Sequence, residues 1–258
     1  MTTRAGLARG QELSGKAVLV TGGARNIGRA IARALAAGGA GVMVNALHSR
    51  DEVDQTVRQI EAAGGAAASC IADVTDPDAV AAMVAAAIDR FGRIDALVNN
   101  AAVRPEHAFA DLPFADWKRV LSVVLDGAFL CSQACLPHLA RAGGGSIVNI
   151  GGETGHRGAA HRAHVVTAKA GLAGMTKALA LDLAPLRITV NCVVPGRIDT
   201  VRDDPAVPGQ PAHRPALPPL GRLGSPEEVA AMVRMLCGPD ARYVTGQAIH
   251  VNGGGFMP

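Results

Sequence analysis

Short apolar runs alternate with longer segments in which apolar residues have helical spacing, along nearly the whole chain. In residues 51–63, for example, Val53, Val57 and Ile60 recur every three to four positions, which predicts an amphipathic helix. Residues 16–21, K-A-V-L-V-T, form a short Val-rich run that is typical of a buried strand. Strands that alternate with helices indicate βαβ units and a parallel sheet.

The predicted strands are all short and rich in Val, Ile and Ala; they cover residues 16–21, 41–45, 67–72, 94–99, 146–151, 188–193 and 248–251. The predicted helices cover residues 27–37, 51–63, 77–90, 114–142, 164–183 and 226–236. We therefore expect a single doubly wound, Rossmann-type α/β domain over residues 1–258, with a mostly parallel seven-stranded sheet. Residues 1–14 are expected to be an N-terminal extension, and residues 201–220, rich in Pro and Gly, a flexible loop.

Composition excludes several other classes of protein. Apolar residues make up 49% of the chain and aromatic residues only 3%, which suits helices packed closely on a sheet. The net charge of +3 is small and no Lys/Arg run occurs, so neither nucleic acid nor an anionic membrane is an expected partner. The start of the chain has no apolar core of signal-peptide length, and no apolar run is expected to reach the ~20 residues of a membrane span.

The cysteines favour a reducing compartment. Their number, five, is odd, and they lie in apolar segments without C-x-x-C spacing. Buried free thiols in the cytoplasm are therefore expected. No metal site is predicted, because the His residues lack a supporting pattern of carboxylates.

The segment T21-G-G-A-R-N-I-G28 joins the first predicted strand to the first predicted helix. Glycines at this junction allow a tight turn and a close approach of the backbone to a pyrophosphate, while the helix N-terminus offers free N–H groups. A lone glycine cluster is weak evidence, since an ordinary strand-to-helix turn has the same composition. Its place at the first strand–helix junction is what a dinucleotide site requires.

Several further motifs follow in order: A72-D-V-T-D76, N99-N-A-A102, the strand S146-I-V-N-I150, Lys169, Pro195-Gly-Arg-Ile-Asp-Thr200 and V244-T-G-Q-A-I-H-V-N-G-G254. Together with the glycine segment, they resemble the short-chain dehydrogenase/reductase family over nearly the whole chain. Ala102 departs from the family's usual glycine by one methyl group.

The resemblance implies a nicotinamide dinucleotide site. Its residues would come from successive loops and one helix: Gly22, Arg25, Ile27, Gly28, Asp73, Val74, Asn100, Ala101, Lys169, Pro195, Gly196, Ile198 and Thr200. By the same resemblance, Asp73 and Val74 would contact adenine, and the residues from Pro195 to Thr200 would flank the nicotinamide. The 201–220 loop would cover the substrate, and its His213 and Arg214 would then lie close to it.

The second predicted strand ends in N45-A-L-H-S-R50, without the acidic residue that binds the 2′-hydroxyl of NAD. Arg25, His48, Ser49 and Arg50 could together hold a 2′-phosphate, which favours NADP, with NAD as the alternative. The alternative interpretation is that Arg25 and Arg50 are solvated surface charges.

The usual catalytic set of the family is mostly missing. The resemblance places Gly152 at its serine, Val165 at its tyrosine and Val124 at its asparagine. Lys169 alone remains, and binding the nicotinamide ribose would be a sufficient use for it. Tyr243, the single tyrosine, lies far along the chain.

Nearby residues offer replacement groups. His164 precedes Val165, and His161 would lie one turn earlier if the helix starts early. If residues 151–154 are extended, Thr154 faces the same way as Gly152, and Glu153 faces solvent or a neighbour. Histidine is the side chain most easily poised for acid/base work near neutral pH. A polar loop that contacts solvent or a partner subunit is the competing interpretation.

Two functions follow from these observations. The first is an NADP(H)-dependent oxidoreductase that acts on a carbonyl or alcohol, with His164, Thr154 and Lys169 as its catalytic residues. The second is an NADP-binding protein without alcohol/ketone redox activity: a regulatory subunit, or a lyase or isomerase. The substrate is expected to be a small molecule, and Arg157 and Arg162 suggest an anionic one. Relatives pair through their helices, so a homotetramer is expected.

Overall fold

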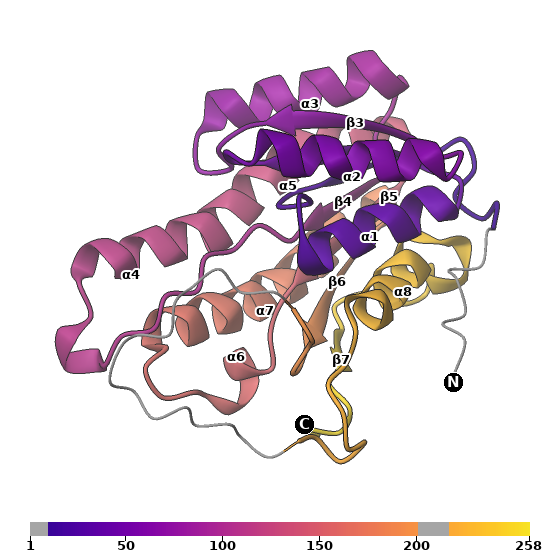
Figure 1. The fold of residues 1–258 in the computed structure, drawn as a ribbon. Coiled ribbons are helices and arrows are strands. Elements are labelled where there is room, and N and C mark those ends of the chain that lie inside the picture. The colour runs from indigo at the N-terminus through magenta and orange to yellow at the C-terminus, as the bar shows by residue number, and fades with distance from the viewer. Residues whose placement is uncertain (1–9, 201–216) are drawn as a thin grey trace.

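The computed structural model describes residues 10–200 and 217–258 as one α/β unit (Figure 1). Its seven strands form one sheet: β1 (Ala17–Val20), β2 (Gly41–Ala46), β3 (Ala66–Ile71), β4 (Ala96–Asn99), β5 (Gly145–Ile150), β6 (Ile188–Pro195) and β7 (Ala248–Val251). Their order is β3-β2-β1-β4-β5-β6-β7, and every pair of neighbours is parallel. The predicted fold is confirmed, with an all-parallel sheet in place of a mostly parallel one.

The helices cover both faces of the sheet (Figure 1). They are α1 (Asn26–Ala37), α2 (Arg50–Ala62), α3 (Pro77–Phe91), α4 (Phe114–Leu121), α5 (Gly127–Arg141), α6 (Thr154–Arg157), α7 (Ala163–Leu183) and α8 (Pro226–Cys237). Short 3₁₀ turns lie at Phe109–Asp111, Ala184–Leu186 and Pro239–Ala241. Alternation along the strands divides the core: Val18 and Val20 pack with α1 and α8, whereas Leu19 packs with α3 and α5.

The chain runs outward from β1 to β3, returns to place β4 beside β1, and runs outward again to β7. The two halves therefore diverge between β1 and β4. In open α/β sheets, ligands bind outside the carboxyl ends of the strands at this point of divergence. The glycine segment follows β1 and the N99-N-A-A102 segment follows β4, so both lie at the expected crevice.

The long helix predicted over residues 114–142 is interrupted. A π turn over Ser122–Asp126 separates α4 from α5, and Val124 is its buried residue. Such turns insert an extra residue into the helix and occur often at functional sites. The interruption lies where the family's asparagine would stand.

Among the described residues, Phe114–Arg141 is long enough to cross a membrane, and its most apolar 18-residue window has a mean hydropathy of 1.6. It is not one continuous apolar run, since it contains Asp116, Lys118, Arg119 and Asp126. Within the fold, however, the same stretch packs against the sheet, α3 and α7. It therefore serves as a core helix of the domain.

The predicted extension is partly built into the fold. Leu13 is completely buried, and its N–H donates to the Gly38 carbonyl at 2.9 Å. Glu12 pairs with Arg234 of α8 at 2.5 Å. Residues 1–9 lie outside the described part, as do residues 201–216 of the predicted loop, including His213 and Arg214.

Four of the five cysteines, Cys131, Cys135, Cys192 and Cys237, are buried, and Cys70 is half-buried; all are free thiols, as predicted. Burial raises the pKa of Cys131 and Cys237 to about 12. These two thiols therefore stay protonated and unreactive at neutral pH.

Candidate active site

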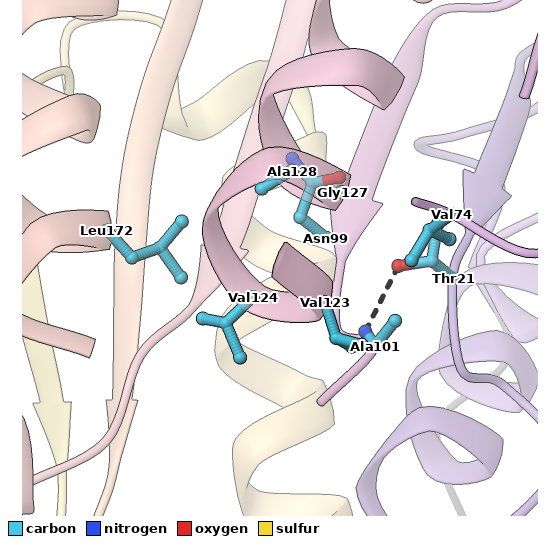
Figure 2. Close-up of a pocket in the computed structure, with 9 residues that line it drawn as sticks. All are labelled: Thr21, Val74, Asn99, Ala101, Val123, Val124, Gly127, Ala128 and Leu172. Atoms are coloured by element: carbon cyan, nitrogen blue, oxygen red, sulfur yellow. Dashed lines mark hydrogen bonds between the residues drawn. The ribbon is translucent and has the colours of Figure 1, made fainter. Parts of the chain in front are cut away.

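Hydrogen bonds of the Asn100 and Thr21 side chains close the glycine turn after β1. Asn100 Nδ2 donates to the Thr21 carbonyl at 3.0 Å and to the Gly22 carbonyl at 2.8 Å. The Thr21 hydroxyl in turn accepts the Ala101 N–H at 3.1 Å, the contact drawn as a dashed line in Figure 2. Asn100 therefore shapes the turn itself.

Two positions in this turn admit only glycine. Gly22 has φ +61°, a left-handed conformation that costs other residues energy. A methyl group on Gly28 would lie 2.1 Å from the Gly22 carbonyl oxygen. The backbone of α1 thus approaches the turn as closely as it can, which leaves the N–H groups of its first turn beside the crevice.

The glycine turn after β1 and the N-terminus of α1 fit a nicotinamide dinucleotide. Gly22, Ile27 and Gly28 would hold its pyrophosphate against the α1 N-terminus, where no acidic residue stands in the first turn. When bound, such a cofactor supplies or accepts a hydride at the nicotinamide.

The residues at the end of β2 bear on the choice between NAD and NADP. Asn45 is buried; its amide donates to the Ala72 carbonyl at 3.0 Å, and its Oδ1 accepts the Gly22 N–H at 3.4 Å. It therefore links three loops and is not available to a ribose. Arg25 and Arg50 are both exposed, and they follow the neighbouring strands β1 and β2.

Asp73 has a local structural role. Its Oδ1 accepts both the N–H and the hydroxyl of Thr75 at 2.8 Å, which fixes the turn after β3. Val74 is buried by that turn and contacts Gly127 at the start of α5. Contact of this pair with adenine stays a prediction.

Lys169 lies on α7 with its side chain buried, and its Nζ donates to the Ile150 carbonyl at 2.6 Å. Burial lowers its pKa to about 8, and nearby Arg104 lowers it too, against the opposite effect of Cys192. A methyl group on Gly152 would lie 3.8 Å from Lys169 Cγ. The position assigned to the missing serine therefore faces the lysine.

The positions that the family resemblance assigns to tyrosine and asparagine meet in one apolar cluster. Val165 and Val124 are both buried, and they pack with Val120, Ala168 and Leu172. Val124 and Leu172 also line an adjoining pocket, which Figure 2 shows with its other lining residues. The space in this pocket that the centre of a water molecule can reach is about 10 Å³. That is room for about one water. No proton donor comes from these positions.

The local backbone overturns one part of the expected geometry. Residues 151–153 do not continue the strand as an extended segment: Glu153 has φ −52° and ψ −35°, and Thr154 begins the helical turn α6. The rule that alternate residues face the same way thus fails here, although Thr154 Oγ1 does lie 3.9 Å from where a Gly152 methyl would be. Glu153, expected to face solvent or a neighbour, is buried and pairs with Arg157 at 2.7 Å.

Both arginines expected to bind a substrate anion already have carboxylate partners. Arg157 pairs with Glu153, and Arg162 pairs with Glu106. Arg104, which sequence reasoning did not select, is exposed and close enough to Lys169 to lower its pKa.

The histidines separate into two kinds. His161 is exposed, has φ +61° and precedes the start of α7 at Ala163, so the proposed early helix start is wrong. His164 is completely buried. Neither of its ring nitrogens makes a well-formed hydrogen bond among the described residues, although the Pro105 carbonyl lies close enough to raise its pKa.

A third histidine, His107, lies beside His164, with 5.9 Å between the ring centroids. Its Nε2 pairs with Asp116 Oδ2 at 2.9 Å. Sequence reasoning missed the contact between His107 and His164, because His107 lies in an irregular loop without a periodic signal and the two residues are far apart along the chain. In the described ranges, no group of three His, Cys, Asp or Glu side chains is placed to hold a metal ion.

Comparisons with known proteins agree with this architecture. A family model described as enoyl-(acyl carrier protein) reductase matches residues 22–255. A 3-oxoacyl-[acyl-carrier-protein] reductase from Staphylococcus aureus is 37% identical over 242 residues, which cover 94% of this chain and 98% of the relative. An L-rhamnose 1-dehydrogenase (NAD(P)(+)) from a Sphingomonas species is 39% identical over 248 residues, 95% of this chain and 98% of the relative.

The chain therefore belongs to the short-chain dehydrogenase/reductase family. Membership supports a nicotinamide nucleotide as cofactor and an oxidoreductase of carbonyl or alcohol substrates as the general class.

Proposed function

We propose that this protein is an NADP(H)-dependent oxidoreductase of a small carbonyl or alcohol substrate, in which His164 replaces the tyrosine as proton donor. The observation that carries the proposal is the buried His164, which directly precedes Val165 and makes no well-formed side-chain hydrogen bond among the described residues, with only the Pro105 carbonyl close to its ring. A buried polar group without a partner costs about 1–3 kcal/mol, so a role in binding or proton transfer would explain its presence.

Lys169 and Thr154 complete the proposed set. Lys169 binds the nicotinamide ribose and holds a positive charge near the reacting oxygen, and Thr154 donates a hydrogen bond to the substrate carbonyl. Support comes from the buried Lys169 ammonium, bound to the Ile150 carbonyl, and from Lys169 Cγ and Thr154 Oγ1, which both lie near the position of a Gly152 methyl group. The exposed Arg104 near Lys169 favours an anionic substrate.

The alternative is a cofactor-binding protein without alcohol/ketone redox activity. The apolar cluster of Val124 and Val165 favours it, because that cluster fills the place where a family member carries its proton donor. A panel of ketones and alcohols, assayed by NADPH oxidation or NADP reduction, separates the two. Turnover that is lost in His164→Asn supports the oxidoreductase, and binding of NADP without turnover supports the alternative.

The protein is expected to bind NADP more tightly than NAD, because Arg25 and Arg50 are exposed at neighbouring strand ends without an acidic residue. A charge-assisted contact is worth about 1.5–3 kcal/mol, so Arg25→Ala should weaken NADP binding by about 10- to 100-fold. Titration calorimetry with both cofactors measures this. Arg141→Ala, an exposed change at the end of α5, is the matched control. Equal affinities for the two cofactors, unchanged in Arg25→Ala, contradict the proposal.

We also propose a cytoplasmic homotetramer. Large apolar side chains are exposed along α4, α5 and α7: Phe114 is 75% exposed, Phe129 49% and Leu181 79%. Contact between copies through these helices would bury them. Light scattering at micromolar concentration should give four times the 26.3 kDa chain mass. Phe129→Glu should lower that mass, and a monomer mass in the parent protein refutes the assembly.

A further inference from the structure

His164 has no surface of its own through which to exchange protons. Its relative exposure is 0%, and no described side chain bonds its ring. A residue that gives one proton in each turnover must receive another before the next. If His164 is the donor, a second titratable group must connect it to solvent.

His107 has the position required of that group. Its ring centroid is 5.9 Å from that of His164, and the ring planes are tilted by 49°. Its side chain is 29% exposed, so it meets solvent on one side and His164 on the other. At this separation, one bridging water or a rotation of the His107 ring can join nitrogens of the two imidazoles.

Asp116 prepares His107 for this role. Its Oδ2 lies 2.9 Å from His107 Nε2, and the carboxylate side chain is itself 30% exposed. A carboxylate that binds one imidazole nitrogen fixes the tautomer and the orientation of the ring. The pair stands on two different elements, because His107 belongs to the loop after β4 and Asp116 to the first turn of α4.

The loop that carries His107 is tied to the segment before α7. The His107 N–H donates to the His161 carbonyl at 2.9 Å. In the adjoining positions, Glu106 pairs with Arg162. These two contacts hold the backbone of this loop against the segment before α7 independently of Asp116.

We propose that the His107–Asp116 pair relays protons between solvent and the buried His164. The inference rests on the proposed function only in naming His164 as the donor to substrate. His107 is a positioning and relay residue, since it is His164 that would meet the substrate oxygen.

The relay moves protons without electrons. When a carbonyl is reduced, an N–H bond of protonated His164 breaks and the O–H bond of the alcohol forms, which leaves His164 neutral. Protonated His107 then returns a proton to His164 and recovers one from solvent beside Asp116. The positive charge of the transferred proton therefore lies either on His107, beside the Asp116 carboxylate, or on His164, one imidazole further away.

The charged and titratable groups around His164 decide its working pH. Burial lowers its pKa below the ordinary 6.5, the neighbouring His107 lowers it further, and Asp116 and the Pro105 carbonyl act in the opposite direction. His164 is therefore neutral at pH 7. In that state it accepts protons, which favours alcohol oxidation at neutral pH and carbonyl reduction below pH 6.5.

NMR of the full-length protein labelled with ¹⁵N-histidine, with NADP present, tests the relay without a substrate. The pKa of His164 should rise in His107→Asn, because a positive neighbour is removed, and fall in Asp116→Asn, because a negative one is removed. Exchange of the His164 ring proton with water should slow at least about tenfold in His107→Asn, since the relay is its route to solvent. His161→Asn is the control. The His161 carbonyl accepts the His107 N–H, but the His161 side chain is exposed, so this variant should change neither the pKa of His164 nor the exchange rate of its ring proton.

Unchanged exchange in a folded His107→Asn protein overturns the relay, as does a His164 pKa that responds to neither variant. If His107→Asn does not fold, Asp116→Asn is the deciding variant. The relay then requires a lower pKa of His164 in Asp116→Asn, and an unchanged or higher pKa overturns it. With an active substrate, His107→Asn should lower kcat, leave the KM for NADPH unchanged and recover with added imidazole. A normal NMR result without turnover of any substrate would retain the relay and refute the proposed oxidoreductase instead.

Discussion

Replacing His164 with asparagine is expected to lower kcat by about 10²–10⁴, the usual contribution of a positioned acid/base group. Asparagine retains hydrogen-bonding capacity in the buried pocket but cannot carry a proton. Its amide is smaller than the imidazole, so the change leaves a small cavity in the completely buried position, and a thermal melt checks that the variant stays folded. Affinity for NADP should be unchanged, because the proposal assigns His164 to the substrate and not to the nucleotide. Steady-state kinetics with calorimetric titration of NADP measures both quantities.

The pH profile sharpens this prediction. Burial and His107 lower the pKa of His164 below 6.5, so the protonated donor becomes populated only as the pH falls below that value. The rate of carbonyl reduction should therefore rise as the pH decreases below 6.5, and this rise should vanish in His164→Asn. His161→Asn is the control, since His161 is exposed and outside α7. Full activity in His164→Asn would show that the proton comes from elsewhere.

Replacing Gly28 with alanine is expected to weaken both the fold and the cofactor site. The added methyl group would lie 2.1 Å from the Gly22 carbonyl oxygen, so either α1 or the glycine turn must move. Overpacking of this kind costs about 1–3 kcal/mol, and a domain of this size loses about 2–4 °C in Tm for each kcal/mol. The displaced α1 N-terminus should also raise the Kd for NADP at least about tenfold.

Gly152→Ala is the matched control for that variant. It makes the same chemical change at the same edge of the sheet, but its methyl group would lie 3.8 Å from Lys169 Cγ, an ordinary contact. Thermal melts and NADP titrations of both variants test the pair. A Gly28→Ala protein with parental Tm and affinity would mean that the turn relaxes without cost and does not form the phosphate cradle.

Much of the fold follows from local sequence. The spacing of Val53, Val57 and Ile60 and the alternation through Val18, Leu19 and Val20 have the periods of a helix and a strand, so the element order could be predicted. The glycine turn could be predicted for a different local reason: its backbone conformation and close packing require glycine at positions 22 and 28. The absence of a tyrosine at Val165 needed nothing more than its fixed distance from Lys169.

Tertiary structure alone decided where the polar side chains go. Residues after β5 turn into α6 instead of extending, and this buries Glu153 against Arg157. The π turn before α5 brings Val124 into the cluster with Val165. Periodicity specifies which face a residue takes within a regular element, but loops have no period. The pairing of His107 with Asp116 beside His164 therefore depends on the path of a loop and on packing between two elements, which the order of residues along the chain does not specify.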